Sequence, residues 1–310
     1  MANFEWTFDA PSGTYKNFSL SADLRSAAVA ESKFMQFVRP ESGYGRKSGE
    51  SITIARVSNL AIPTSGKLVE GIKIPEDSLT ISSVSITVSE WGRAVPYTSL
   101  SDDLSKFDME SIVQKELMKQ MRLILDNAAA AAFKTCKLKA NSTSVSAVTI
   151  STSGSFSGSS TNKLNVAMVE QIRDYMYQTA IVPPYEGDDY ICILSTPAKR
   201  GLLSDPSWED WHKYTDPQSK YNGEVGRIEN IRFIETNNAG ALGSTTANIG
   251  DALFFGADAV VMAVALDPEL RAGIPGDFGR QKAVAWYGIM EFGLVWDTAN
   301  AGEAKVLHFG

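Results

Sequence analysis

The sequence predicts an α+β fold, and three patterns lead to that prediction. Helical periodicity runs without a break over ~30 residues from Asp108, which at 1.5 Å per residue corresponds to a helix of about 45 Å. Before this helix, residues 51–98 alternate between apolar and polar side chains, as strands do. After it, residues 164–265 alternate helix and strand patterns, and further strand patterns close the chain. A chain of this length is expected to pack as two lobes.

Composition and charge narrow the class of protein. The chain has 310 residues, of which 44% are hydrophobic and 21% charged, so global disorder is excluded. The formal net charge is −7 and no block of Lys and Arg stands out, so the basic surface of a nucleic-acid-binding protein is missing. The opening residues MANFEWTFDAPSGTYK lack the segments of a signal peptide, and no apolar run is long enough to span a bilayer. We therefore expect a soluble protein that is made in the cytoplasm.

The two cysteines, Cys136 and Cys192, belong to no C-x-x-C pair. In a reducing cytoplasm this favours two buried thiols, with a single disulfide as the alternative.

The N-terminal segment is expected to be an arm. One short helix is predicted within SADLRSAAVAESKFMQF, with Ser21 as its N-cap and Pro40 after its end. Gly43, Gly45 and Gly49 follow as a flexible connector.

The next segment is expected to be a long two-stranded excursion. The alternation changes phase between Ile81 and Val84, which predicts a bulge or turn at Ser82 and Ser83. An isolated hairpin is marginally stable in water, so we expect it to rest on another body, such as a neighbouring subunit.

The long helix carries its own start and stop signals. Asp108 is a suitable N-cap, and Phe107 and Ile112 occupy the two positions of a hydrophobic staple. Glu110 suits the positive end of the helix dipole, and Lys134 suits the negative end. This helix is expected to be the structural spine.

The segment after the spine is rich in Ser, Thr and Gly. Residues 141–163 are expected to be either a flexible linker or a weak strand pair around Val145–Ile150. In the lobe that follows, Asn165 caps a helix, DDYICILS is a buried strand, and Thr196-Pro197 opens a second helix. Near the end of the chain, 283–296 is apolar on both alternating faces, which predicts a strand covered on both sides.

Asp277-Phe278-Gly279 spells the triplet that holds magnesium in protein kinases, but the other parts of a kinase are missing. The two histidines, His212 and His308, do not belong to a His-Arg-Asp catalytic loop. Only 31 residues follow Gly279, too few for a helical lobe. The triplet is therefore interpreted as a turn before a strand.

Other partial motifs fail in the same way. Gly66-Lys67 lacks the first glycine and the hydroxyl of a phosphate loop, and GSFSG places Phe156 where a nucleophilic serine would stand. Asp210 and His212 have metal-ligand spacing but no third ligand nearby. We expect no catalytic, cofactor-binding or metal site.

One loop gathers aromatic side chains: Trp208, Trp211, Tyr214 and Tyr221. A platform for a sugar or nucleotide is one interpretation. Packing between subunits or lobes is favoured, because aromatic residues are enriched at protein interfaces.

Several stretches, in their order along the chain, resemble the major capsid protein of tailed bacteriophages with the Hong Kong 97-type fold. They are similar in particular to the branch named after phage N-four. The stretches span residues ~35–300 in the order expected for the family. They are ITVSEWGRAVPYT, DLSKFDMESIVQKEL, LDNAAAAAFK, NGEVGRIENIRFIETNNA, LFFGADAV and PGDFGRQKAVAWYGIMEFGLVWD.

The resemblance implies a division of the chain. It consists of an N-terminal arm (1–49), an E-loop (50–98), a P-domain (99–163 and 266–310) and an A-domain (164–265).

The resemblance also implies a function. The chain would self-assemble through pentamers and hexamers into an icosahedral shell that encloses double-stranded DNA. Its partners would be further copies of itself, a separate scaffolding protein, a portal and a decoration protein; it would use no cofactor and reside in the virion after assembly in the host cytoplasm. Some related shells are cross-linked through an E-loop lysine, and Lys67 and Lys73 lie where such a lysine would stand, with solvated or salt-bridged lysines as the alternative. The candidate assembly-interface residues are Lys67, Glu70, Lys73, Trp91, Arg93, Trp208, Trp211 and Tyr214.

Two other functions remain open from the sequence. An encapsulin-like nanocompartment would keep the fold and hold a cargo enzyme. An α+β hydrolase or sugar-binding protein would use the aromatic loop 205–223.

Overall fold

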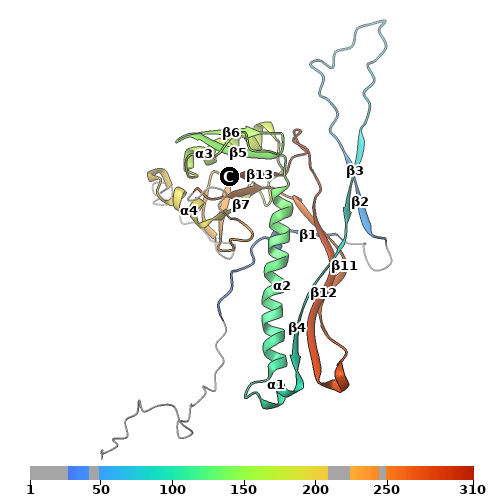
Figure 1. Cartoon of the computed structure of the whole chain (residues 1–310). Helices are drawn as coiled ribbons and strands as arrows, with labels where there is room; N and C mark the ends of the chain where they lie inside the picture. Colours follow the sequence, from blue (N-terminus) through green and yellow to red (C-terminus); the bar gives the residue numbers. More distant parts are fainter. Residues whose placement is uncertain (1–26, 42–48, 209–223, 244–248) are drawn as a thin grey trace, which may run out of the picture.

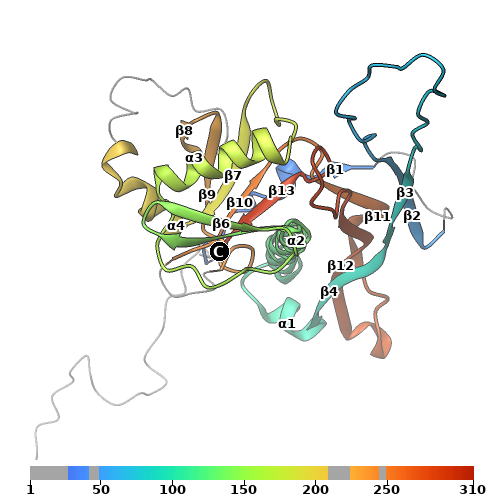
Figure 2. The same cartoon turned by 90° about the horizontal axis from the view of Figure 1, so that it is seen from above.

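The computed structural model describes residues 27–41, 49–208, 224–243 and 249–310. A long helix, α2 (Met109–Lys134), lies between two bodies. One body is a narrow sheet that runs alongside the helix, and the other is a broader lobe at its C-terminal end (Figure 1). A two-stranded hairpin projects away from both (Figure 2).

The spine helix is confirmed. It begins after Asp108, whose side chain accepts a hydrogen bond from the backbone N–H of Glu110 at 3.1 Å. It ends at Lys134, with Thr135 as its C-cap. A short helix, α1 (Ser99–Leu104), precedes it and is capped by Thr98.

The narrow body is a four-stranded sheet in the order β1-β11-β12-β4. Its strands are β1 (Arg39–Pro40), β11 (Val260–Ala272), β12 (Gln281–Leu294) and β4 (Ser89–Thr98). The spine helix covers one face, where Trp286 (1% exposed) packs with Val113 and Leu117 of α2. The β12 residues that alternate with Trp286 are only half-buried. The prediction of a strand covered on both sides is therefore wrong for the single chain, because only one face has the helix against it.

The projecting hairpin pairs β2 (Ser51–Val57) with β3 (Ile81–Thr87). Their register is continuous from Ser51 opposite Thr87 to Val57 opposite Ile81, so the predicted bulge at Ser82 and Ser83 is wrong. The change of phase arises because Ile81 lies on the exposed side of the strand. The chain changes sheet after Thr87, and β4 pairs with β12. Residues 89–98, which were expected to belong to the two-stranded segment 50–98, thus form part of the four-stranded sheet.

The lobe is built on a seven-stranded sheet in the order β6-β5-β13-β10-β7-β9-β8. The strands are β5 (Leu138–Ser144), β6 (Ala147–Ser151), β7 (Tyr190–Ser195), β8 (Glu224–Ile228), β9 (Ile231–Thr236), β10 (Ala252–Phe255) and β13 (Val306–Phe309). Three helical segments belong to the lobe: α3 (Val166–Asp174), its π-helical extension η2 (Tyr175–Thr179), and α4 (Thr196–Leu203). As predicted, Asn165 caps α3 by accepting from the N–H of Met168 at 3.0 Å. The cap of α4 is Ser195, one residue earlier than expected.

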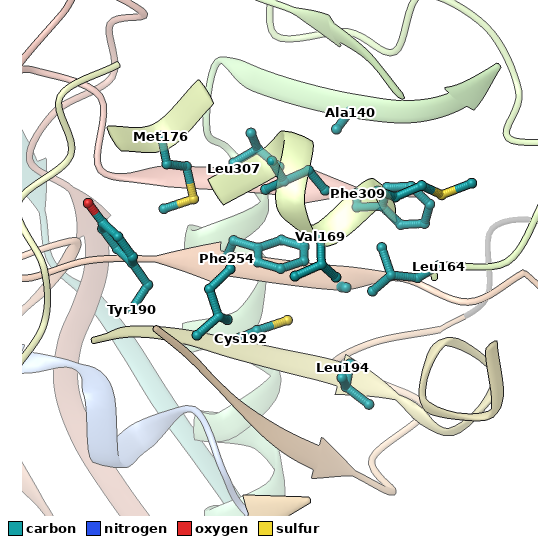
Figure 3. Close-up of a cluster of buried hydrophobic side chains, with 14 of the residues drawn as sticks. Ala140, Leu164, Val169, Met176, Tyr190, Cys192, Leu194, Phe254, Leu307 and Phe309 are labelled. Carbon is teal, nitrogen blue, oxygen red and sulfur yellow. The ribbon is translucent and has the colours of Figure 1, made fainter. Parts of the chain in front are cut away.

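The central strands of the lobe are buried on both faces. Cys192 and Phe254 point into the core beneath α3, which Figure 3 shows together with Val169 of that helix. Their neighbours Ile193 and Phe255 point into a second core that is shared with the spine helix. Such two-sided burial explains the continuous apolar runs of β7 and β10.

Long-range pairing joins strands across the borders of the expected division, which itself stays a prediction. The Ser/Thr-rich segment forms the β5–β6 strand pair rather than a linker, and β5 joins the lobe sheet through the parallel strand β13. Both β5 and β13 fall within the expected P-domain, whereas β11 begins at Val260, inside the expected A-domain. Sheet membership depends on partners far away in the chain, and local patterns do not specify it.

The arm has no α-helix between residues 27 and 41, so the described part of the predicted helix is wrong. A 3₁₀ turn, η1 (Met35–Phe37), stands at its end. The backbone N–H groups of Lys33 and Phe34 donate to Asp126 of the spine instead of to a helix. The predicted cap Ser21 and the connector glycines Gly43 and Gly45 lie outside the described residues.

Two further local predictions are confirmed. Asp277–Gly279 form the turn η3 between β11 and β12, with Asp277 and Phe278 at positive φ (47° and 51°). Cys136 and Cys192 are free and buried, and burial raises the pKa of the Cys136 thiol to about 11, as expected of an inert thiol.

Candidate assembly surfaces

The loop that joins β2 to β3 exposes an unusual number of large apolar side chains. We define the excursion as residues 57–81, from the end of β2 to the start of β3. Nine of the 21 exposed large hydrophobic side chains in the described part of the chain lie on it. They are Val57, Leu60, Ile62, Leu68, Val69, Ile72, Ile74, Leu79 and Ile81. An apolar concentration of this kind on a projecting element is typical of a contact surface.

The candidate charged residues of the excursion are exposed as well. Lys67 and Glu70 point to solvent, and Lys73 forms an ion pair with Glu76 at 2.5 Å. Both side chains of that pair are more than 70% exposed (79% and 74%), so it contributes little to stability. These side chains are thus placed where a second molecule could reach them.

A second apolar surface is the part of the other face of the four-stranded sheet that the β2–β3 hairpin leaves uncovered. Residues that are directly opposite each other share a face, which places Tyr287 beside Gly92 and Ile289 beside Glu90. The hydroxyl of Tyr287 donates to Glu90 at 3.1 Å. A side chain at Gly92 would come within 2.7 Å of the backbone oxygen of Trp286, so glycine is required there. The result is a half-buried face with small residues at its centre.

The other two candidates on β4 lie on the helix side or at the edge. Trp91 is half-buried, donates from Nε1 to the backbone oxygen of Met290 at 2.9 Å, and packs toward the spine helix. Arg93 is exposed. The structure therefore gives Trp91 a role inside the subunit, whereas Arg93 is accessible.

The aromatic loop is described only at its start. Trp208 is 6% exposed and its ring meets that of Phe233 edge-on, with centroids 5.6 Å apart. It therefore belongs to the core of the lobe. Trp211, Tyr214 and Tyr221 lie outside the described residues.

The far end of the narrow sheet exposes further apolar side chains. Ile274 and Phe278 at the β11–β12 turn are almost fully exposed, at 97% and 107%. Leu100 and Leu104 of α1 are exposed at the same end of the molecule (Figure 1). This end and the excursion lie at opposite ends of the narrow body.

Within the described ranges, no group of three or more His, Cys, Asp or Glu side chains is arranged to hold a metal ion. None of the helices there is long and apolar enough to cross a membrane.

Sequence reasoning selected charged and aromatic residues and missed the apolar ones of the excursion. The sequence signal for these residues is that 57–81 contains many apolar side chains without the alternation of a strand. That signal is ambiguous in sequence, because the same residues could have formed part of a core.

Neither a family model nor a curated protein matches this chain. Solved structures do. The acid-stable capsid structure of Helicobacter pylori bacteriophage KHP30 superposes with a TM-score of 0.71 at 13% identity, covering 98% of both chains. The capsid of cyanophage Pam1 gives 0.69 at 16% identity over 100% of this chain and 98% of that one. The capsid of Ralstonia phage GP4 gives 0.65 at 15% identity over 98% and 97%.

These similarities extend over nearly the whole of each chain, so they concern the complete architecture and not a shared lobe. The narrower branch named after phage N-four stays a prediction. The chain has the Hong Kong 97-type fold of phage capsid proteins, as the sequence resemblance predicted.

Proposed function

We propose that this chain is a major capsid protein, which self-assembles through pentamers and hexamers into the icosahedral shell of a phage head. The observation that carries the proposal is the apolar excursion on a chain with a capsid fold. Its nine large side chains stay between 50% and 95% exposed in the described part of the chain. Full burial of one such side chain contributes about 1.5–3 kcal/mol, so covering them with a second copy is strongly favourable.

The receiving surface would be the uncovered face of the four-stranded sheet in a neighbouring copy. Tyr287 and Ile289 supply apolar area there, and the small side chain of Ala94 leaves room for an incoming side chain. Interfaces of this type have an apolar centre and a charged rim. Lys67, Glu70, Lys73 and Arg93 would belong to that rim.

The arm supplies a second link between copies. Its described part is fixed to the spine at Asp126. We expect the arm to bridge to another subunit. Closed rings multiply such modest contacts, and assembly should therefore depend steeply on concentration.

The charge balance is compatible with a container for DNA. With a net charge of −7, the shell would not hold the phosphate backbone tightly, and DNA could be packed against it. The role requires neither catalysis nor a cofactor. The remaining parts of the proposal are a separate scaffolding protein, a portal, a decoration protein, assembly in the host cytoplasm and final residence in the virion.

Electron microscopy of the purified chain at increasing concentration, alone and with scaffolding protein, tests the proposal. We expect capsomer rings or closed shells. A chain that stays monomeric at high concentration with scaffold present would contradict it. Shells that enclose a co-expressed enzyme instead of DNA would favour the nanocompartment.

A further inference from the structure

The chain that joins β12 to β13 touches three parts of the molecule. We call residues 295–305 the bracket. On one side the bracket contacts the end of the β2–β3 hairpin at which the excursion begins, near Arg56 and Ser82. On the other side it contacts the lobe, and it continues directly from the four-stranded sheet.

Arg56 of β2 is the main contact between hairpin and bracket. Its guanidinium donates to the backbone oxygen of Val295 at 3.0 Å and to Oδ1 of Asp297 at 2.5 Å. The same group lies over the ring of Trp296, 5.6 Å from its centroid. Nε donates to Ser82 of the partner strand β3 at 2.8 Å. The Arg56 side chain is only 11% exposed although it stands on a projecting hairpin.

Glu303 makes the second contact. It is 5% exposed and accepts hydrogen bonds from Thr298 (2.7 Å) and Asn300 (2.9 Å) within the bracket. Burial would raise the pKa of the Glu303 carboxyl, but the side chains of Thr298, Asn300 and Ser58, the residue after β2, lower it. A Cβ atom at Gly302 would lie 2.6 Å from the side-chain amide of Asn59, so the chain just after β2 also packs against the bracket. The buried carboxylate therefore lies where the bracket meets the hairpin.

The bracket is bonded to the lobe as well. The N–H of Gly302 donates to the backbone oxygen of Ala180, just after η2, at 2.7 Å. The backbone oxygen of Lys305 accepts from the N–H of Gly256, just after β10, at 3.1 Å. Any movement of the bracket is thereby transmitted to the lobe.

Next to this polar contact lies an apolar one of a different kind. Ile86 of β3 is 5% exposed and packs with Val261 and Ala263 of β11. It also lies over Gly293, where a Cβ atom would come within 2.5 Å of the Ile86 side chain. Apolar contacts are non-directional, whereas charge-assisted hydrogen bonds to a guanidinium fix an angle. The Ile86 contact therefore permits the hairpin to swing, and Arg56 selects one direction.

We propose that the bracket is a direction lock, which couples the direction of the excursion to the position of the lobe through Arg56 and Glu303. The contacts of Arg56 and Glu303 belong to the single chain, whatever its function. The use that we assign to them in assembly rests on the proposed function. One sequence that builds both pentamers and hexamers must present its excursion at more than one angle relative to its lobe. A few hydrogen bonds beside an apolar contact would allow the hairpin a small set of angles relative to the lobe and would exclude unrestricted movement.

Hydrogen exchange of the full-length, unassembled subunit tests the lock directly. Arg56→Lys keeps the charge but loses the planar fork, so exchange in 52–57 and 82–87 should accelerate on the order of tenfold, as expected for the loss of charge-assisted bonds. Exchange in the spine helix should not change. Arg271→Lys is the matched control, because Arg271 pairs with the exposed Glu269 far from the hairpin and should leave 52–57 unaffected. Unchanged exchange in the hairpin of the Arg56 variant would overturn the lock.

Glu303→Gln tests whether the hairpin is coupled to the lobe, and exchange in the spine helix shows whether the variant is folded. It should accelerate exchange at the hairpin base and at the Gly302 amide together, while the spine helix stays protected. Acceleration confined to the bracket, with the hairpin unchanged, would refute coupling. In assembly, Arg56→Lys should broaden the distribution of shell diameters relative to the unsubstituted chain. If no variant forms shells, the proposed function fails, and the exchange results still decide the lock.

Discussion

Oδ1 of Asp126, in the middle of the spine helix, accepts the backbone N–H of Phe34 at 2.8 Å. The same oxygen accepts from the N–H of Lys33 (3.0 Å) and the hydroxyl of Ser32 (2.9 Å), and Asp126 is fully buried. Because buried donors left without a partner are costly, this carboxylate is what holds the arm against the spine.

Asp126→Ala should therefore destabilise the subunit by about 2–4 kcal/mol, since the buried N–H groups of Lys33 and Phe34 and the amide of Asn238 lose an acceptor. Urea unfolding with a constant m-value would measure the difference. Asp126→Asn retains one oxygen and should lose less than the alanine variant. Equal stability of both variants and the unsubstituted chain would show that the arm is held by Phe34 and Phe37 alone.

The β11–β12 turn and the strand that follows it should respond very differently to substitution. Trp286→Asp places a charge against the spine helix where Trp286 is 1% exposed, so we expect no folded subunit. Asp277→Ala removes an exposed side chain whose ion pair with Arg280 is long (3.4 Å), so assembly should be nearly intact. Circular dichroism and sedimentation of both variants provide the measurement, and tolerance of both would mean that β12 is misplaced.

The excursion should be required for assembly but not for folding. Ile72→Asp and Ile74→Asp change side chains that are 68% and 63% exposed, so the unfolding midpoint should move little. Shell formation should be lost, because a charge would then have to be buried at the interface. Val145→Asp, at 69% exposure in the β5–β6 turn, is the matched control and should still assemble. Normal shells from the Ile72 and Ile74 variants would rule out the excursion as the contact.

Two glycines allow a test of close packing in the lobe. A Cβ atom at Gly256 would lie 1.9 Å from the backbone oxygen of Pro183, whereas nothing lies within 4 Å of such an atom at Gly66. Gly256→Ala should cost about 1–3 kcal/mol, and Gly66→Ala should be neutral within about 0.5 kcal/mol. Thermal unfolding of the pair measures the contrast, and equal melting temperatures would contradict the tight contact.

His308 should make stability depend on pH. Its Nδ1 lies 3.1 Å from Nζ of Lys139, which can only donate, so Nδ1 is the acceptor. Burial lowers the pKa of His308; the carboxylate of Asp251, 3.9 Å from Nε2, opposes this, and Lys139 and Lys134 add to it. A lowered folded-state pKa means that the unfolded chain takes up the proton first.

Stability is therefore fully present above about pH 6.5 and should fall as the pH drops toward the folded-state pKa, by at most about 1.4 kcal/mol per pH unit. Urea unfolding between pH 7 and 5.5 would measure this slope. His308→Asn keeps an acceptor for Lys139 but does not titrate, so its slope should be smaller. A parallel decline in both proteins would assign the effect to other groups.

Much of the fold could be predicted because it depends on short-range patterns. The spine helix from Asp108, the cap at Asn165 and the turn at Asp277 all follow from residues within one or two helical turns of each other. The resemblance of the ordered motifs extended this to the architecture as a whole.

The division into sheets could not be predicted in the same way. β13 joins the lobe through a strand that is more than 150 residues away, with Leu307 opposite Leu138, and nothing local distinguishes this partner from β12. For the same reason, the local pattern of 89–98 predicts a strand of the hairpin, whereas β4 pairs with β12.

The candidate surface shows the limitation most clearly. The sequence by itself shows which residues are apolar, charged or aromatic, and on that basis Trp208 is a candidate for an interface and Ile72 is not. In the folded chain, Trp208 lies in the core of its own lobe, whereas Ile72 stays exposed on the excursion. The physical reason is that the hydrophobic effect rewards removal of apolar area from water without specifying which surface covers it. For Trp208, the covering surface comes from the fold of its own chain. For the excursion, we infer that the covering surface belongs to a second chain.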